Sequence, residues 1–291
     1  MEGWSRGGIT MRFSKIMPSI LMAQSGKVLE NLTMKSKILN MDRLYSVYLP
    51  PDYETSNRSY PVLYLLHGSG DDQTSWIQFG EVNYIADKAI KEGKSTEMII
   101  VMPDANTGRR GYFNTFRGDF RYEDFFFQEF IPYIEKTYRI RAEKQYRAIS
   151  GNSMGGGGTV IYALHHPEMF AAACPLSPTI QLPNANSNSN RRSADTVGRQ
   201  RTSEQLDLYN KQLDAIYLVE NMPDNQKTQV RWYIDCGDDD FLFEGNSLFH
   251  IALRKKEIPH EYRVRDGVHG WIYWRVSLPE VLDFISKGFH R

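Results

Sequence analysis

The chain has 291 residues, of which 41% are hydrophobic and 13% aromatic, so it can bury a substantial apolar core. Its 35 Lys and Arg residues balance 35 Asp and Glu residues, which argues against a dedicated nucleic-acid-binding surface. No apolar run reaches the roughly 18 residues that are needed to cross a bilayer, so we expect no membrane span.

Short apolar runs alternate with helical patterns along most of the chain. Several runs, such as 62–66 and 98–102, are continuously apolar, which is typical of strands covered on both faces. The predicted strands are residues 28–39, 43–49, 62–66, 98–102, 146–149, 170–176, 230–235 and 260–264. The predicted helices are residues 76–91, 122–138, 154–165, 246–257 and 271–288.

This alternation predicts an α/β fold with a mostly parallel central sheet and helices on both faces. We expect one domain over residues 1–291, because no convincing linker interrupts the pattern. The pattern does break at residues 181–228, where the Asn-rich segment 184–190 precedes a stretch over 202–220 whose apolar residues recur at helical spacing. We interpret 181–228 as an insertion with the character of a lid.

The two cysteines, Cys174 and Cys236, fall in predicted core strands and lack metal-type spacing. This favours buried free thiols over the alternative, a disulfide between adjacent strands.

Residues 11–23 have a basic start, a short apolar part and a small residue before Gln24, which is the outline of a secretory signal peptide. However, Pro18 interrupts the apolar part and ten residues precede Met11. The alternative is an N-terminal strand at the sheet edge. Localisation therefore stays open between secreted or periplasmic and cytoplasmic.

The sequence Gly151-Asn-Ser153-Met-Gly155 has the form G-x-S-x-G and lies between a predicted strand and a predicted helix. A serine on such a sharp turn presents its hydroxyl to the solvent, and the small flanking residues allow the turn. A hydroxyl is a weak nucleophile at neutral pH, so it needs a base, a group that orients the base, and donors for the oxyanion.

The other members of such a constellation follow in chain order. His269 lies in a loop between the last strand and the last helix, and it is the best candidate for the base. The acid comes from Asp238-Asp-Asp240, which directly follows a core strand; Asp240 is preferred and Asp238 is the alternative. The oxyanion donors are expected to be the backbone N–H groups of Met154 and of Ser69, which follows another strand end.

Five motifs in this order resemble the putative-esterase family of α/β-hydrolases, over about residues 40 to 288. They are His67–Asp72, Met102–Asp104, Gly151–Gly156, Cys236–Phe241 and His269–Trp271. The family includes feruloyl and acetyl-xylan esterases of carbohydrate esterase family one, S-formylglutathione hydrolases and mycobacterial mycolyltransferases. The resemblance implies an α/β-hydrolase fold and serine-ester chemistry, and it assigns the acid to Asp240 and the oxyanion donor to Ser69.

We therefore expect a serine carboxyl-ester hydrolase that needs no cofactor or metal. A feruloyl esterase acting on plant cell-wall polysaccharide esters is the first choice, followed by an acetyl-xylan or short-chain acyl esterase and then an S-formylglutathione hydrolase. A catalytically inactive carbohydrate-binding module is the alternative from a different class, and oligomeric state stays open. The candidate substrate-binding residues are Trp76, Arg109, Tyr112, Phe113 and Trp271.

Overall fold

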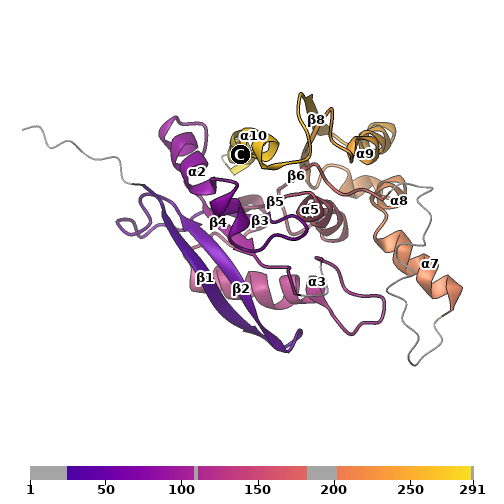
Figure 1. The fold of residues 1–291 in the computed structure, drawn as a ribbon, viewed down its shortest axis with the longest axis horizontal. Helices are drawn as coiled ribbons and strands as arrows, with labels where there is room; N and C mark the ends of the chain where they lie inside the picture. Colours follow the sequence, from indigo (N-terminus) through magenta and orange to yellow (C-terminus); the bar gives the residue numbers. More distant parts are fainter. Residues whose placement is uncertain (1–24, 108–110, 182–201, 290–291) are drawn as a thin grey trace, which may run out of the picture.

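A computed structural model describes residues 25–107, 111–181 and 202–289. Within these residues, eight strands form one sheet in the order β1-β2-β4-β3-β5-β6-β7-β8 (Figure 1). The strands are β1 (Lys27–Ser36), β2 (Met41–Leu49), β3 (Val62–Leu66), β4 (Ile99–Pro103), β5 (Arg147–Asn152), β6 (Ala172–Leu176), β7 (Arg231–Gly237) and β8 (His260–Arg265). Each of them matches a strand predicted from the sequence, within a few residues.

Strand direction changes only near one edge of the sheet. β2 pairs antiparallel with both β1 and β4, whereas the pairs from β4 through β8 are parallel. This mostly parallel sheet, with helices on both faces, confirms the predicted α/β-hydrolase fold. It also places the carboxyl ends of β3 to β8 along one edge, where ligands and catalytic groups collect in such sheets.

The helical segments include two places where a continuous helix was expected and an interruption is found. The helices are α1 (Ser75–Gln78), α2 (Val82–Lys91), α3 (Tyr122–Phe125), α4 (Ile131–Thr137), α5 (Met154–His165), α7 (Ser203–Gln212), α8 (Ala215–Glu220), α9 (Phe243–Lys255) and α10 (Trp271–Phe289). A π-helical turn η1 (Phe126–Phe130) joins α3 to α4, and η2 (Lys144–Tyr146) and η3 (Asp224–Gln226) are 3₁₀ turns.

Both interruptions have a local cause. α1 and α2 are separated at Glu81, whose φ of 53° is left-handed and cannot continue a right-handed helix. α7 and α8 are separated at Asp214, whose carboxylate accepts hydrogen bonds from the N–H groups of Ile216 and Tyr217, both at 3.0 Å. Asp214 therefore starts a new helix as its N-cap.

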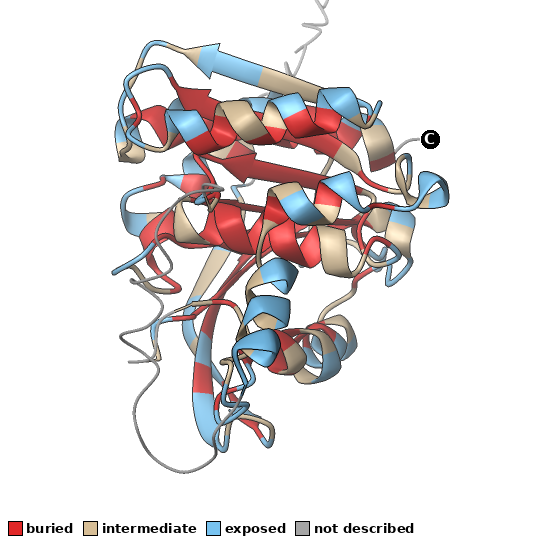
Figure 2. Ribbon diagram, turned by 90° about the vertical axis from the view of Figure 1, so that its right-hand side faces the viewer, coloured by how far each residue is buried: buried red, intermediate tan, exposed pale blue. Residues whose placement is uncertain are grey.

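Alternate residues of the central strands point into two separate apolar clusters. In β3, Val62, Tyr64 and Leu66 join one cluster, whereas Leu63 and Leu65 join the other. The first cluster includes residues of α3, α4, α5, α8 and α9, and the second includes residues of α2 and α10. Figure 2 shows the buried strands between helices whose outer faces are exposed. This period-two alternation explains why the strands are apolar along their whole length.

The described part of the predicted insertion is helical. α8 contributes Ala215 and Val219 to the first cluster, so it belongs to the body of the fold. α7 has no buried residue and lies at the periphery (Figure 1). The Tyr209 hydroxyl of α7 donates to the Asn114 carbonyl at 2.9 Å, which ties α7 to the loop after β4. The Asn-rich segment lies outside the described residues.

Three other expectations concern the possible leader, the cysteines and membrane spans. Residues 11–23, the possible leader, lie outside the described residues. Cys174 and Cys236 are both buried and free, as expected. Among the described helices, none combines the length and apolar character that a membrane span requires.

A buried ion pair fastens α4 to the start of β5. Arg147 donates from Nε and Nη2 to the Glu135 carboxylate at 2.7 and 3.1 Å. The same guanidinium also donates to the carbonyls of Met169 and Ala142 at 2.8 and 2.7 Å. Arg147 is buried, so its charge depends on these acceptors for the solvation that water would otherwise give.

We predict that Glu135→Ala lowers the free energy of unfolding by about 3 kcal/mol, because it leaves the buried guanidinium without its counter-charge. Asp283→Ala is the control, since it removes only an exposed pair with Lys287 and should cost about 1 kcal/mol or less. Urea denaturation of both variants measures the difference. Similar small losses for both would contradict the role given to Glu135.

Candidate active site

Ser153 stands at the sharp turn between β5 and α5. Its φ of 54° and ψ of −115° lie outside the regions that a non-glycine residue normally adopts. Hydrogen bonds hold it there: its N–H donates to the Leu176 carbonyl at 2.9 Å, and its own carbonyl accepts from Gly157 and Thr179 at 2.9 and 3.1 Å. Strain of this kind persists only where the surroundings enforce it, and it concentrates at functional sites.

Two glycines make the turn possible. A Cβ at Gly155 would lie 2.6 Å from the carbonyl oxygens of Leu66 and His67. A Cβ at Gly151 would lie 2.7 Å from the Leu66 side chain and 2.8 Å from the Gly155 backbone. Any side chain at either position would push the end of β3 away from α5. The G-x-S-x-G spacing is therefore a packing requirement of this elbow.

The structure brings together the three residues that the sequence proposed as a catalytic set. His269 Nε2 lies 2.9 Å from Ser153 Oγ. On the other side of the ring, His269 Nδ1 lies 2.8 Å from Asp240 Oδ2 and 3.0 Å from Oδ1. These distances are within hydrogen-bonding range. The three residues come from the ends of β5, β7 and β8, so the parallel sheet itself brings them to one edge.

Asp240 is fully buried and its charge is compensated by several donors. Burial alone would raise the pKa of its carboxyl, but hydrogen bonds from the His269 ring, the Leu242 N–H and the Ser177 hydroxyl outweigh this and lower the pKa. The Leu242 N–H lies 2.9 Å from Asp240 Oδ1. The carboxylate is therefore ionised near neutral pH and acts as an acceptor for the imidazole.

Asp238, the alternative acid, has a different contact. Its Oδ1 accepts a hydrogen bond from the Gly267 N–H at 3.0 Å, and the Asp239 N–H donates to the Gly267 carbonyl at 3.1 Å. These bonds join the loop that carries Asp240 to the loop that carries His269. In this structure Asp240, and not Asp238, contacts the imidazole.

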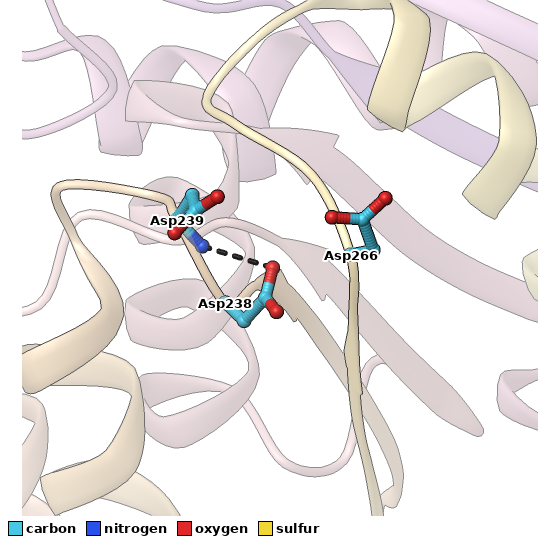
Figure 3. A group of neighbouring side chains, drawn as sticks. All are labelled: Asp238, Asp239 and Asp266. Atoms are coloured by element: carbon cyan, nitrogen blue, oxygen red, sulfur yellow. Dashed lines mark hydrogen bonds between the residues drawn. The ribbon is translucent and has the colours of Figure 1, made fainter.

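Figure 3 shows that Asp238, Asp239 and Asp266 lie close together on these two loops. Their carboxylate oxygens lie within 4.8 Å of one another, and all three residues are exposed. Exposed carboxylates often gather on protein surfaces, and the backbone contacts of Asp238 account for its position. We assign no metal to this cluster.

The turn after β3 lies directly against the nucleophile. A Cβ at Gly68 would be 3.6 Å from the Ser153 Cβ, and Ser69 is the next residue of this turn. Ser69 is exposed, and Met154 opens α5 next to Ser153. Each expected donor residue thus directly follows a residue of this contact: Ser69 follows Gly68, and Met154 follows Ser153.

His67 and Tyr112 shape this turn. His67 Nε2 accepts from the Ala105 N–H at 2.8 Å, so Nδ1 carries the proton and donates to the Gly68 carbonyl at 2.8 Å. The Tyr112 hydroxyl accepts from the His67 N–H at 2.9 Å and donates to the His67 carbonyl at 3.0 Å. Nothing in the sequence connected Tyr112 with this turn.

The expected substrate-binding residues that the structure describes lie in different surroundings. Trp76 and Tyr112 are fully buried, in clusters on opposite faces of the sheet, so neither side chain is available to a substrate. Phe113 is half-buried and packs edge-on against Tyr162. Arg109 lies outside the described residues.

Trp271 is the remaining candidate, and it is linked to the catalytic centre through aromatic contacts. Its ring centroid is 5.0 Å from that of Trp76 and 5.2 Å from that of Trp274. Trp274 in turn packs edge-to-face against His269 at 5.0 Å and donates from Nε1 to Ser177 Oγ at 3.2 Å. Trp271 is half-buried, and its ring centroid also lies 5.9 Å from that of Phe79.

Comparison with known proteins gives a consistent result. A family model described as "Putative esterase" matches residues 36–285. A solved structure of a ferulic acid esterase superposes with a TM-score of 0.78 at 36% identity, covering 91% of this chain and 99% of the other.

Two curated relatives are similar over part of the chain. An esterase of Mycobacterium tuberculosis is 40% identical over 141 residues, which is 47% of this chain and 29% of that protein. An endo-1,4-beta-xylanase/feruloyl esterase of Xylanibacter ruminicola is 36% identical over 161 residues, which is 53% of this chain and 22% of that protein. The matches thus cover less than a third of the length of each of these relatives.

The lowered pKa of Asp240 predicts a pH-dependent contribution to stability. A carboxyl with a depressed folded-state pKa stabilises the fold above its unfolded pKa of about 3.9, and this stabilisation is lost as the pH falls through the folded pKa. Asp240→Asn should therefore lower the free energy of unfolding more at about pH 7 than at about pH 3. Urea denaturation at both pH values measures this.

Asp239→Asn is the control for this measurement, because Asp239 is exposed and does not contact the imidazole. Its effect should be small at both pH values. A loss in Asp240→Asn that is the same at both pH values would show that the carboxylate's charge is not what stabilises the site.

Proposed function

The chain belongs to the putative esterase family, and on that premise we propose that it is a serine carboxyl-ester hydrolase. One observation carries the proposal: His269 lies within hydrogen-bonding distance of Ser153 Oγ on one side, at 2.9 Å, and of the Asp240 carboxylate on the other, at 2.8 Å. A serine, an imidazole and a carboxylate in this arrangement can activate the hydroxyl as a nucleophile.

In the acylation step, Ser153 Oγ attacks the ester carbonyl carbon and its proton passes to His269 Nε2. Asp240 accepts from Nδ1–H, so it selects the tautomer in which Nε2 is free to take that proton, and it stabilises the resulting imidazolium. The tetrahedral intermediate then breaks its bond to the alcohol oxygen. His269 returns the proton to this oxygen, and the alcohol leaves.

In the deacylation step, a water molecule takes the place of the alcohol. His269 removes a proton from the water as its oxygen attacks the acyl carbon. The bond between this carbon and Ser153 Oγ then breaks, His269 returns the proton to Oγ, and the free acid leaves. In both steps the carbonyl oxygen becomes negatively charged. We assign the stabilisation of this charge to two N–H groups: that of Met154, which directly follows the nucleophile at the start of α5, and that of Ser69, on the turn that His67 and Tyr112 hold in place.

For the acyl group we propose a hydroxycinnamoyl ester, such as a feruloyl ester of plant cell-wall polysaccharide. The similar structure and one curated relative are described as ferulic acid or feruloyl esterases. Trp271 is half-buried and is linked through Trp274 to the imidazole, which makes it the proposed aromatic partner of the acyl group. Acetyl esters of xylan are the second candidate, because a small acyl group needs no aromatic partner and Trp76 and Tyr112 are not available to form one.

We predict that Ser153→Ala lowers kcat for p-nitrophenyl acetate by about 10⁶-fold, because it removes the nucleophile of the triad. Ser247→Ala on α9 is the control and should keep the wild-type rate. Equal rates for wild type and Ser153→Ala would contradict the serine mechanism. Such a result would favour a binding module on the same fold.

The acyl group is tested with two substrates. Methyl ferulate should be hydrolysed with a higher kcat/KM than acetylated xylan, because a hydroxycinnamoyl group can bury its ring against Trp271 and an acetyl group cannot. Trp271→Ala should lower kcat/KM for methyl ferulate about tenfold and leave the acetyl substrate nearly unchanged. Turnover of the acetyl substrate alone would make the feruloyl assignment wrong.

A further inference from the structure

Phe241 is a large apolar side chain in an unusual position. It directly follows the buried Asp240, yet it is 73% exposed. Its ring centroid lies 4.5 Å from that of His269, with an angle of 52° between the two planes. The imidazole therefore contacts an aromatic ring that is itself exposed to solvent.

The two loops around Phe241 expose the carboxylates Asp238, Asp239 and Asp266 and also apolar side chains. On the neighbouring loop, Val268 precedes His269 and is 61% exposed, and Ile272 at the start of α10 is 75% exposed. The two loops run side by side, because the Asp239 N–H donates to the Gly267 carbonyl at 3.1 Å. Single exposed apolar residues are ordinary, but Phe241 follows the acid and Val268 precedes the base in sequence, and this indicates a contact surface at the centre.

Hydrogen bonds to Asp240 fix the backbone on the far side of Phe241. The Leu242 N–H donates to Asp240 Oδ1 at 2.9 Å, and the Phe243 N–H donates to the Asp240 carbonyl at 2.9 Å. The backbone around Phe241 is thus held in a tight turn around the carboxylate. A backbone that is already held in place loses little conformational entropy when a ligand binds.

The chemistry of the site indicates which half of an ester would meet this surface. His269 Nε2 must reach the leaving oxygen to protonate it, so the alcohol half of the substrate passes beside the imidazole. The acyl half stays bonded to Ser153, with its carbonyl oxygen toward Met154 and Ser69. A ring packed on the imidazole is therefore next to the alcohol half.

We propose that Phe241 is a specificity-determining residue for the leaving group, and that it provides an apolar platform for alcohols that present the face of a ring, such as a sugar. The inference rests on the proposed serine hydrolase function and concerns the alcohol rather than the acyl group. Methanol and other small alcohols are too short to cover the platform and gain nothing from it.

The test compares esters that share one acyl group, feruloyl or acetyl, whichever the wild-type enzyme hydrolyses faster. The methyl, arabinosyl and benzyl esters give the same acyl-enzyme, so deacylation is identical and kcat/KM reports only the alcohol. Phe241→Ala should lower kcat/KM about tenfold for the two ring esters, and about twofold or less for the methyl ester. Phe241→Trp should restore the ring esters.

Phe243→Ala is the matched control, because Phe243 is also exposed, at 54%, but follows the turn at the start of α9. It should leave all three substrates nearly unchanged. A loss on one ring ester alone still supports the platform and identifies which kind of alcohol it takes. An equal loss on all three esters would overturn the proposal, since Phe241 would then only support His269.

No loss on either ring ester would also overturn the platform. Ser153→Ala is measured on the same substrates, so the two proposals fail separately. If that variant keeps its activity, the serine mechanism is wrong; if it is inactive and Phe241→Ala does not distinguish the esters, only the platform is wrong.

Discussion

The contact on which the rest of the site depends is the pair of hydrogen bonds made by one imidazole. His269 bonds Ser153 through Nε2 and Asp240 through Nδ1, and each partner comes from a different strand end. β5, β7 and β8 are parallel and lie in one sheet, so their carboxyl ends share an edge. Three loops that are far apart in sequence therefore need only short excursions to meet.

Two features of this arrangement are energetically unfavourable, the strained backbone of Ser153 and the buried charge of Asp240, and the fold compensates for each of them. The strained backbone of Ser153 is held by hydrogen bonds to β6 and the segment after it, and Gly151 and Gly155 allow β3 to pack tightly against the elbow. The buried charge of Asp240 is compensated by donors from its own turn and from Ser177. Neither compensation comes from the imidazole alone, so the site is preorganised before a substrate arrives.

Local patterns in the sequence predicted the strands, the elbow and the three residues that meet at the sheet edge. Patterns of apolar residues and the G-x-S-x-G spacing depend on neighbours in sequence, which a single chain displays directly. The aromatic substrate-binding residues could not be predicted from the sequence in the same way. Trp76 and Tyr112 look suited to a ligand by residue type, but their exposure depends on which distant segments pack over them, and both are buried. Two expected helices are interrupted, at Glu81 by a left-handed backbone and at Asp214 by an N-cap. The spacing of apolar residues carries no information about either feature.

The supports of the site divide into two groups with different partners. The oxyanion turn is held by His67, which bonds the Gly68 carbonyl and the Ala105 N–H, and by the Tyr112 hydroxyl. The acid and base loops are held mainly by each other, through the backbone of Gly267. Ser153 is where the two groups meet. In the proposed mechanism the acyl carbonyl therefore faces a turn anchored in the core, whereas the alcohol faces two surface loops. If the proposed mechanism holds, the alcohol half of the substrate can change without disturbing the groups assigned to the oxyanion.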